Sequence, residues 1–203
     1  MRILVVGATG TIGRAVVAAL TPHHEIVPVS HSSTPITVDL AQPASIRTMY
    51  QVVGRVDAVI SVAGLAKFSS LATLSDEDFS FSLMNKLMGQ VNLVRFGFDH
   101  VKDQGSFALT SGVLSRLPMI GSAAISLVNA GLEGFARAAA LEAPRGSRVN
   151  AVSPPWVKET LQALGMDPAR GLPAATVAQT YVQALEGTAN GQVLEPVGAS
   201  GSA

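Results

Sequence analysis

The stretch VVGATGTIGRAVVAAL, residues 5–20, joins an apolar run to a segment with helical spacing. The run begins at Arg2 and ends at Val6, and the helical segment begins at Thr11. The turn between them contains Gly7 and Gly10, and Gly13 follows one turn later. Glycine adopts positive φ and lets another chain segment approach closely. The stretch therefore predicts a strand, a tight turn and a helix in direct succession.

The rest of the chain repeats this alternation of short apolar runs and longer helical patterns. Further strands are expected at 25–29, 36–38, 57–64, 105–112, 147–154 and 192–197, and further helices at 45–53, about 81–101, 121–143 and 176–186. Parallel strands joined by right-handed crossover helices form a doubly wound sheet. We therefore expect an α/β protein with a single, Rossmann-like parallel sheet in one domain over residues 1–197, and a flexible tail at 198–203.

The composition narrows the kinds of partner. Acidic and basic residues number 14 each, so no net charge would attract nucleic acid or an anionic membrane. Cysteine is absent, which excludes thiolate metal sites and cysteine nucleophiles. Histidines at 23, 24, 31 and 100 lack the spacing of a metal pair, so no metal is expected. The apolar run Ile3–Val6 is too short for a signal peptide or a membrane span, and we expect a soluble, cytoplasmic protein.

A glycine-rich turn between a strand and a helix is the context in which a dinucleotide diphosphate binds, although the turn could also need glycine for geometry alone. The second predicted strand ends in VPVSHSS, which offers Ser30, His31 and Ser32 and no carboxylate for ribose hydroxyls. This pattern favours NADP(H) over NAD(H). Arg14 either adds charge for the extra phosphate or is an ordinary exposed residue of the helix.

Several segments together resemble the short-chain dehydrogenase/reductase family, from Met1 to about Thr160. GATGTIG, residues 7–13, resembles its cofactor loop, and VDL at 38–40 stands where the family packs an aspartate against adenine. SVAG at 61–64 is similar to its NNAG strand end, and LTSG at 109–112 resembles the strand with the catalytic serine. RVNAVSPPWVKET, 148–160, is similar to the segment beside the nicotinamide. The resemblance implies a cofactor site made of Gly7, Thr9, Gly10, Thr11, Ile12, Gly13, Ser30, His31, Ser32, Asp39, Leu40, Val62, Ala63, Gly64, Pro154 and Val157.

The chain departs from that family at the catalytic tetrad of Asn, Ser, Tyr and Lys. Asn129 stands in place of the lysine, and Ile125, four residues earlier, in place of the tyrosine. Lys86 occupies the asparagine position, and only Ser111 is retained. The chain is thus identified as an atypical member that lacks the YxxxK motif. Asn129 is expected to hold a ribose hydroxyl, or else to be satisfied by backbone or water within a helix contact.

Three hypotheses follow for the function. In the first, the protein is an NADP-dependent oxidoreductase that acts on a small carbonyl or alcohol, with Lys86 as a non-standard acid, Ser111 holding the substrate oxygen and Asn129 on the ribose. In the second, it is an inactive NADP-binding sensor or scaffold, and Lys86 is simply solvated or bonded to backbone. A structural protein without a cofactor is the third.

The substrate region should be short, because prolines at 168 and 173 close the segment 161–173. Trp156, Leu161, Leu164 and Met166 either line an open pocket or cap the core. The helix 121–143 is rich in alanine and glycine, and with the helix from Phe81 it resembles the pair through which the family assembles. A homodimer or homotetramer is therefore expected.

Overall fold

The computed structural model describes residues 1–197, and the predicted tail at 198–203 lies outside them. A seven-stranded parallel sheet has the order β3-β2-β1-β4-β5-β6-β7. The strands are β1 (Arg2–Val6), β2 (Glu25–Ser30), β3 (Ile36–Thr37), β4 (Val56–Ser61), β5 (Val101–Thr110), β6 (Arg148–Val152) and β7 (Val193–Leu194). The predicted single, doubly wound parallel sheet is confirmed.

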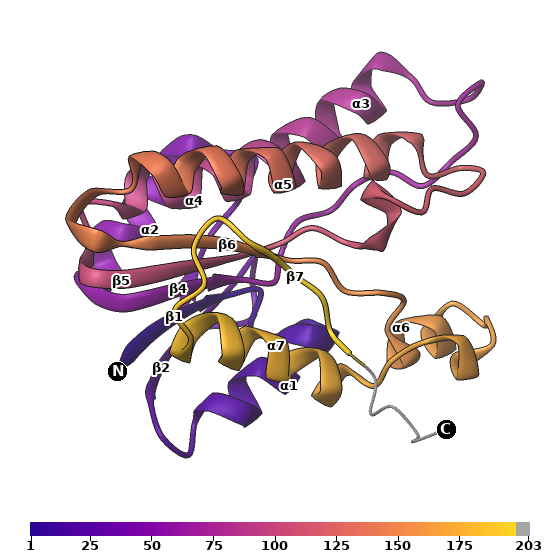
Figure 1. Cartoon of the computed structure of the whole chain (residues 1–203). Helices are drawn as coiled ribbons and strands as arrows, with labels where there is room; N and C mark the ends of the chain where they lie inside the picture. Colours follow the sequence, from indigo (N-terminus) through magenta and orange to yellow (C-terminus); the bar gives the residue numbers. More distant parts are fainter. Residues whose placement is uncertain (198–203) are drawn as a thin grey trace.

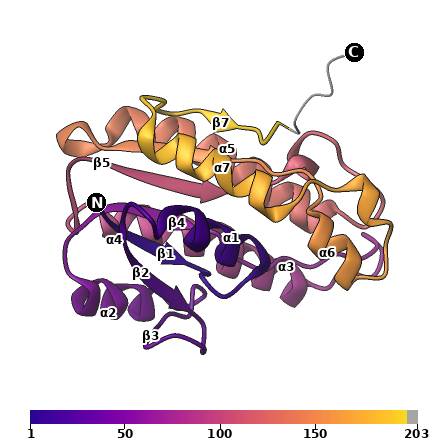
Figure 2. The ribbon, with the colours of Figure 1, turned by 90° about the horizontal axis from the view of Figure 1, so that it is seen from below.

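Helices cover both faces of this sheet (Figure 1). One face carries α2 (Pro43–Val53), α4 (Gly89–Gly97) and α5 (Ala123–Glu142), and the other carries α1 (Thr11–Leu20) and α7 (Ala174–Glu186). Figure 2, a view from below, shows α1 and α7 side by side in front of the strands. The remaining helices are α3 (Asp76–Ser82), a π-helix at Leu83–Met88, α6 (Lys158–Ala163) and 3₁₀ turns at Val113–Ser115, Pro144–Gly146 and Pro168–Arg170.

The chain reverses direction across the sheet between β1 and β4. From β1 it proceeds through α1 to β2 and β3, and then returns through α2 to β4, which pairs with β1 on its other side. The connections after β1 and β4 therefore leave in opposite directions and open a crevice at the carboxyl ends of these strands. Ligands of doubly wound proteins bind at this switch point.

The glycine turn fits tightly into that crevice. Gly7 has φ +90°, and a Cβ placed on it would lie 2.8 Å from the backbone carbonyl of Val62. A Cβ on Gly13 would lie 1.9 Å from the oxygen of Gly7. These glycines are therefore required by close backbone contacts between β1, α1 and the end of β4.

Some predicted boundaries were wrong. The expected helix over about 81–101 is three consecutive segments, α3, the π-helix and α4, and β5 already begins at Val101. A capping box of Ser75 and Asp78 starts α3 earlier than the apolar pattern indicated. The edge strands β3 and β7 are shorter than predicted, and the helix α6 was not predicted. Within residues 1–197, no helix combines the length and apolar character needed to cross a membrane.

Candidate functional site

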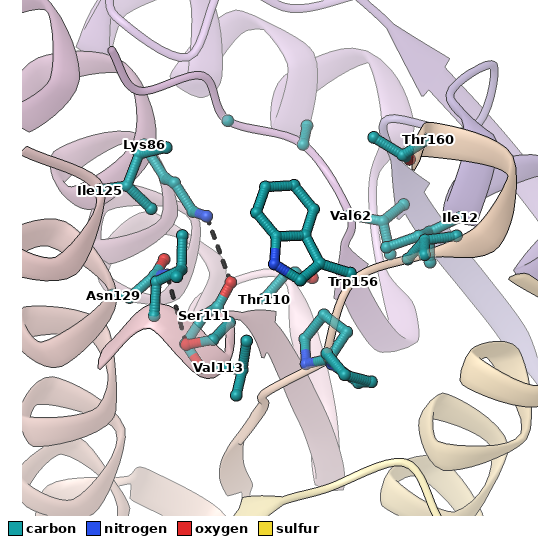
Figure 3. A pocket seen from close by; sticks show the side chains of 17 residues that line it. Ile12, Val62, Lys86, Thr110, Ser111, Val113, Ile125, Asn129, Trp156 and Thr160 are labelled. Carbon is teal, nitrogen blue, oxygen red and sulfur yellow. Dashed lines mark hydrogen bonds between the residues drawn. The ribbon is translucent and has the colours of Figure 1, made fainter. Parts of the chain in front are cut away.

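Two cavities meet at the switch point. The first, the glycine-loop cavity, has a volume of about 290 Å³ and lies over Gly7, Thr9 and Gly10. The second, the β5 cavity, has a volume of about 270 Å³ and lies beyond the end of β5 (Figure 3). Both are lined by residues 62–64, which follow β4. Together they form one elongated site along the carboxyl ends of the strands.

Most of the predicted cofactor residues line this site. Gly7, Thr9, Gly10, Ser30, His31 and Leu40 line the glycine-loop cavity, Ile12, Pro154 and Val157 line the β5 cavity, and Val62, Ala63 and Gly64 line both. Four of the predicted residues line neither cavity, and these are Thr11, Gly13, Ser32 and Asp39. Gly13 packs against the turn, and the Asp39 carboxylate accepts a hydrogen bond from the backbone of Ala41 at 2.9 Å.

The helix α1 starts between the two cavities without a side-chain cap, because its N-cap residue Gly10 lines the glycine-loop cavity and Ile12 lines the β5 cavity. Within residues 1–197 no side chain hydrogen-bonds to the helix start at Gly10, and the first turn carries no acidic residue. The Arg14 guanidinium donates to the carbonyl of Thr9 and so braces the turn. Free N–H groups and the positive end of a helix dipole attract an anion, so this turn suits a diphosphate.

Lys86 reaches the β5 cavity from the π-helix. Its Nζ donates to the backbone oxygen of Ser111 at 3.2 Å, as the dashed line in Figure 3 marks. Burial favours the neutral amine and lowers the pKa of Lys86 from 10.5 to about 8. A π-helix is rare and occurs frequently at functional sites. The ammonium group is thus available as a proton donor or as a positive charge beside the cavity.

Asn129 lies in the same cavity, one helical turn after Ile125, and is only 2% exposed. Its Nδ2 donates to the oxygen of Gly112 at 3.3 Å. Its Oδ1 is buried and has no hydrogen-bond partner in the part of the chain that the structure describes. A buried acceptor needs a donor. Backbone contacts therefore satisfy only half of this amide, and a ligand hydroxyl would satisfy the other half.

Ser111 lines the cavity, but its hydroxyl is engaged elsewhere. Its Oγ donates to Oε1 of Glu133 at 3.1 Å, and the Ser115 hydroxyl donates to the same oxygen at 2.6 Å. Glu133 was not predicted to be part of the site. Its spacing could have indicated it, because position 133 follows Asn129 by four residues and so shares its face of α5.

Neither of the two tyrosines of the chain lines either cavity. Tyr50 donates to the oxygen of Leu93 at 2.6 Å, far inside the α2–α4 contact. Tyr181 lies close behind the site, because its hydroxyl is 2.7 Å from Oγ1 of Thr110, which lines the β5 cavity. Both rings are fully buried, and burial raises the pKa of each hydroxyl. Tyr181 therefore supports the floor of the cavity from behind.

Only one of the four residues expected around the substrate region lines a cavity. Trp156, the only tryptophan of the chain, lines the β5 cavity. Leu161 is buried in the protein, whereas Leu164 and Met166 are exposed and line neither cavity. Among residues 1–197, no group of three histidine, aspartate or glutamate side chains is placed to hold a metal ion.

Comparisons with known proteins agree with this architecture. A family model described as enoyl-(acyl carrier protein) reductase matches residues 11–190. Hydroxynaphthalene reductase arp2 of Aspergillus fumigatus is 30% identical over 138 residues, 66% of this chain and 50% of that protein. Oxidoreductase UcpA of Escherichia coli is 27% identical over 136 residues, 63% and 52% of the two chains. The chain thus spans about half the length of these curated relatives.

Two solved structures are similar over nearly their whole length. Protein lin1944 from Listeria innocua has a TM-score of 0.92 and 38% identity, covering 96% of this chain and 98% of that one. A small-chain dehydrogenase in complex with NADPH has a TM-score of 0.85 and 23% identity, covering 96% and 95%. At that identity the second likeness concerns the fold alone.

The lowered pKa of Lys86 predicts a stability effect with a definite sign. Between about pH 8 and pH 10.5 the unfolded chain binds more protons at this group than the folded chain does. Its contribution to the unfolding free energy therefore increases as pH rises through that window. Denaturant unfolding at a series of pH values should show this increase in the wild type and not in Lys86→Met. The exposed variant Lys102→Met is the control, and equal slopes in wild type and Lys86→Met would contradict the buried lysine.

Proposed function

We propose, because the chain belongs to the short-chain dehydrogenase/reductase family, that it is an NADP-dependent oxidoreductase for a small carbonyl or alcohol. Residues 1–197 would form the NADP-binding domain. One observation carries the proposal. The lysine amine and the unpaired amide oxygen of Asn129 both belong to a cavity that continues into the glycine turn.

The cofactor would lie along both cavities. Backbone N–H groups of the first turn of α1 would hold the diphosphate, because those of Gly7, Ala8 and Gly10 already donate to backbone oxygens. Oδ1 of Asn129 would accept a hydrogen bond from a ribose hydroxyl. The reduced nicotinamide supplies the hydride. Ser30 and His31 would contact the 2′-phosphate, since neither brings a carboxylate to the glycine-loop cavity. NADPH and NADP in the complexes of two structural neighbours support this preference.

Lys86 would take over the acid function of the missing tyrosine. A group whose pKa is about 8 can give up a proton near neutral pH and regain it afterwards. Ser111, whose backbone oxygen holds the amine, would contact the substrate oxygen through its hydroxyl. The ammonium would also stabilise negative charge that develops on that oxygen, because a fixed positive charge beside an oxyanion lowers the energy of the transition state.

A second candidate is an inactive NADP-binding sensor or scaffold. Ile125 favours it, since this side chain lines the cavity where the family carries its tyrosine and cannot transfer a proton. The amine of Lys86 would then be a fixed hydrogen-bond donor only. This candidate shares the cofactor site with the first and differs from it only in turnover.

Cofactor preference can be read from Trp156 without a substrate, because energy transfer from this tryptophan to a reduced nicotinamide quenches its emission. We expect NADPH to bind about tenfold or more tightly than NADH, as charge-assisted hydrogen bonds to a phosphate allow. Ser30→Asp should reverse the preference by repelling the phosphate, whereas Thr37→Asp on the edge strand should not.

Asn129→Ala should weaken the binding of both nucleotides equally, because both carry the same ribose beside the nicotinamide. Failure of both nucleotides to bind would refute the proposal.

Turnover separates the two candidates. With NADPH and a panel of neutral aromatic ketones, Lys86→Met and Ser111→Ala should each lower kcat by about 10²-fold or more, the usual worth of acid catalysis. Lys102→Met, at an exposed ion pair with Asp57, should retain the wild-type rate. Tight NADPH binding without turnover of any ketone or alcohol would instead favour the sensor.

We also propose that the chain assembles through α4 and α5. Leu127 and Leu141 support this, because both are exposed on α5 and would be covered in a dimer. Light scattering should then give a multiple of the 20.9 kDa mass of one chain. A monomer mass at working concentration would contradict the assembly. The cytoplasmic location stays a prediction, which cell fractionation would test.

A further inference from the structure

The single hydrogen of the Ser111 hydroxyl points into the protein. Two acceptors lie within reach of Oγ, namely Oε1 of Glu133 at 3.1 Å and the backbone oxygen of Val152 at 3.3 Å. A carbonyl oxygen and an ionised carboxylate accept hydrogen bonds and cannot donate them. As long as Glu133 is ionised, both contacts therefore require the Ser111 hydrogen, and the hydroxyl has none left for a substrate oxygen.

Glu133 is an unusual partner for this serine. Its side chain extends from the middle of α5 into the protein, and the residue is only 4% exposed. Besides Ser111, the Ser115 hydroxyl donates to Oε1, and the Arg137 guanidinium stands 3.8 Å from Oε2. Burying a carboxylate among hydroxyl groups costs more than burying an apolar side chain of the same size. Packing alone therefore gives no reason for a glutamate at this position.

Two charged groups face the carboxyl group, Arg137 from the same helix and Arg116 from the segment after the 3₁₀ turn. A third cation, Lys86, bonds to the backbone oxygen of Ser111 and lines the β5 cavity. Ser111 consequently lies between two opposite charges, the ammonium at its backbone oxygen and the carboxylate at its hydroxyl.

We infer that Glu133 is a positioning residue that decides whether Ser111 can donate a hydrogen bond into the β5 cavity. Its carboxylate oxygen Oε1 holds the Ser111 hydrogen. A donor group in the place of Oε1 would instead bond to Oγ of Ser111 and leave the serine hydrogen free for a carbonyl oxygen. The inference rests on the proposed function, because it assigns Ser111 to a carbonyl substrate.

Binding of acetophenone to the NADP⁺-loaded protein tests this without turnover, with Trp156 emission as the readout. Glu133→Gln is neutral and brings an N–H donor, so it should bind the ketone about two- to tenfold more tightly than wild type at pH 7, the usual worth of one hydrogen bond. Any effect of Lys86 is common to both proteins.

A double-mutant cycle shows whether Glu133 acts through the serine. In the Ser111→Ala background, Glu133→Gln should change acetophenone affinity by less than about twofold. Glu142→Gln, an exposed change on the same helix, should match wild type. Glu133→Gln should leave NADP⁺ affinity unchanged, which excludes a folding defect.

The possible failures are distinguishable. If Glu133→Gln binds acetophenone no more tightly than wild type, or has the same effect without Ser111, the inference is overturned and the oxidoreductase proposal stays intact. No binding of NADP⁺ by the wild type overturns the proposed function itself. NADP⁺ binding without acetophenone binding in wild type and Glu133→Gln alike removes the role of Ser111 toward a ketone, and with it this inference.

Discussion

Close contact between three backbone segments is the constraint on which the whole site depends. The turn at Gly7, the first helix at Gly13 and the chain after β4 at Val62 approach so closely that none of the contacts admits a further carbon. The contact fixes the start of α1 beside the end of β4. Residues 62–64 can then line both cavities, and the helix N-terminus and the catalytic candidates belong to one continuous site.

Electrostatics at the far end of this site depend on few groups. Ile125 and Asn129, the side chains proposed to stand at the family's tyrosine and lysine positions, carry no charge. The charged groups bonded to Ser111 are the amine of Lys86, at its backbone oxygen, and the carboxyl group of Glu133, at its hydroxyl. Lys86 is partly buried and Glu133 is buried, and charges interact more strongly in such surroundings than in water. The proposed chemistry thus relies on one serine whose hydrogen bonds are set by these two groups.

The sequence predicted the parts of the molecule that follow from local pattern. Periodicity identified the strands from β1 to β6, and the glycine turn predicted the switch-point crevice. The π-helix and the role of Glu133 were not predicted, for different physical reasons. A wide helical turn leaves no distinctive spacing, and a glutamate in an amphipathic helix is ordinarily solvent-exposed. Only the packing of the 111–115 segment against α5 turns this glutamate inward, and that packing depends on contacts between residues distant in sequence.

The hydrogen bond between Tyr181 and Thr110 has a consequence for biogenesis. It fastens α7 beneath the end of β5, and α7 also packs against α1, the first helix of the chain (Figure 1). Ribosomes release the amino-terminal elements first. The face of the central strands that α1 and α7 share is therefore only partly covered until residues 174–186 emerge. During that interval the nascent chain exposes an apolar surface to which chaperones can bind and which is buried in the folded protein.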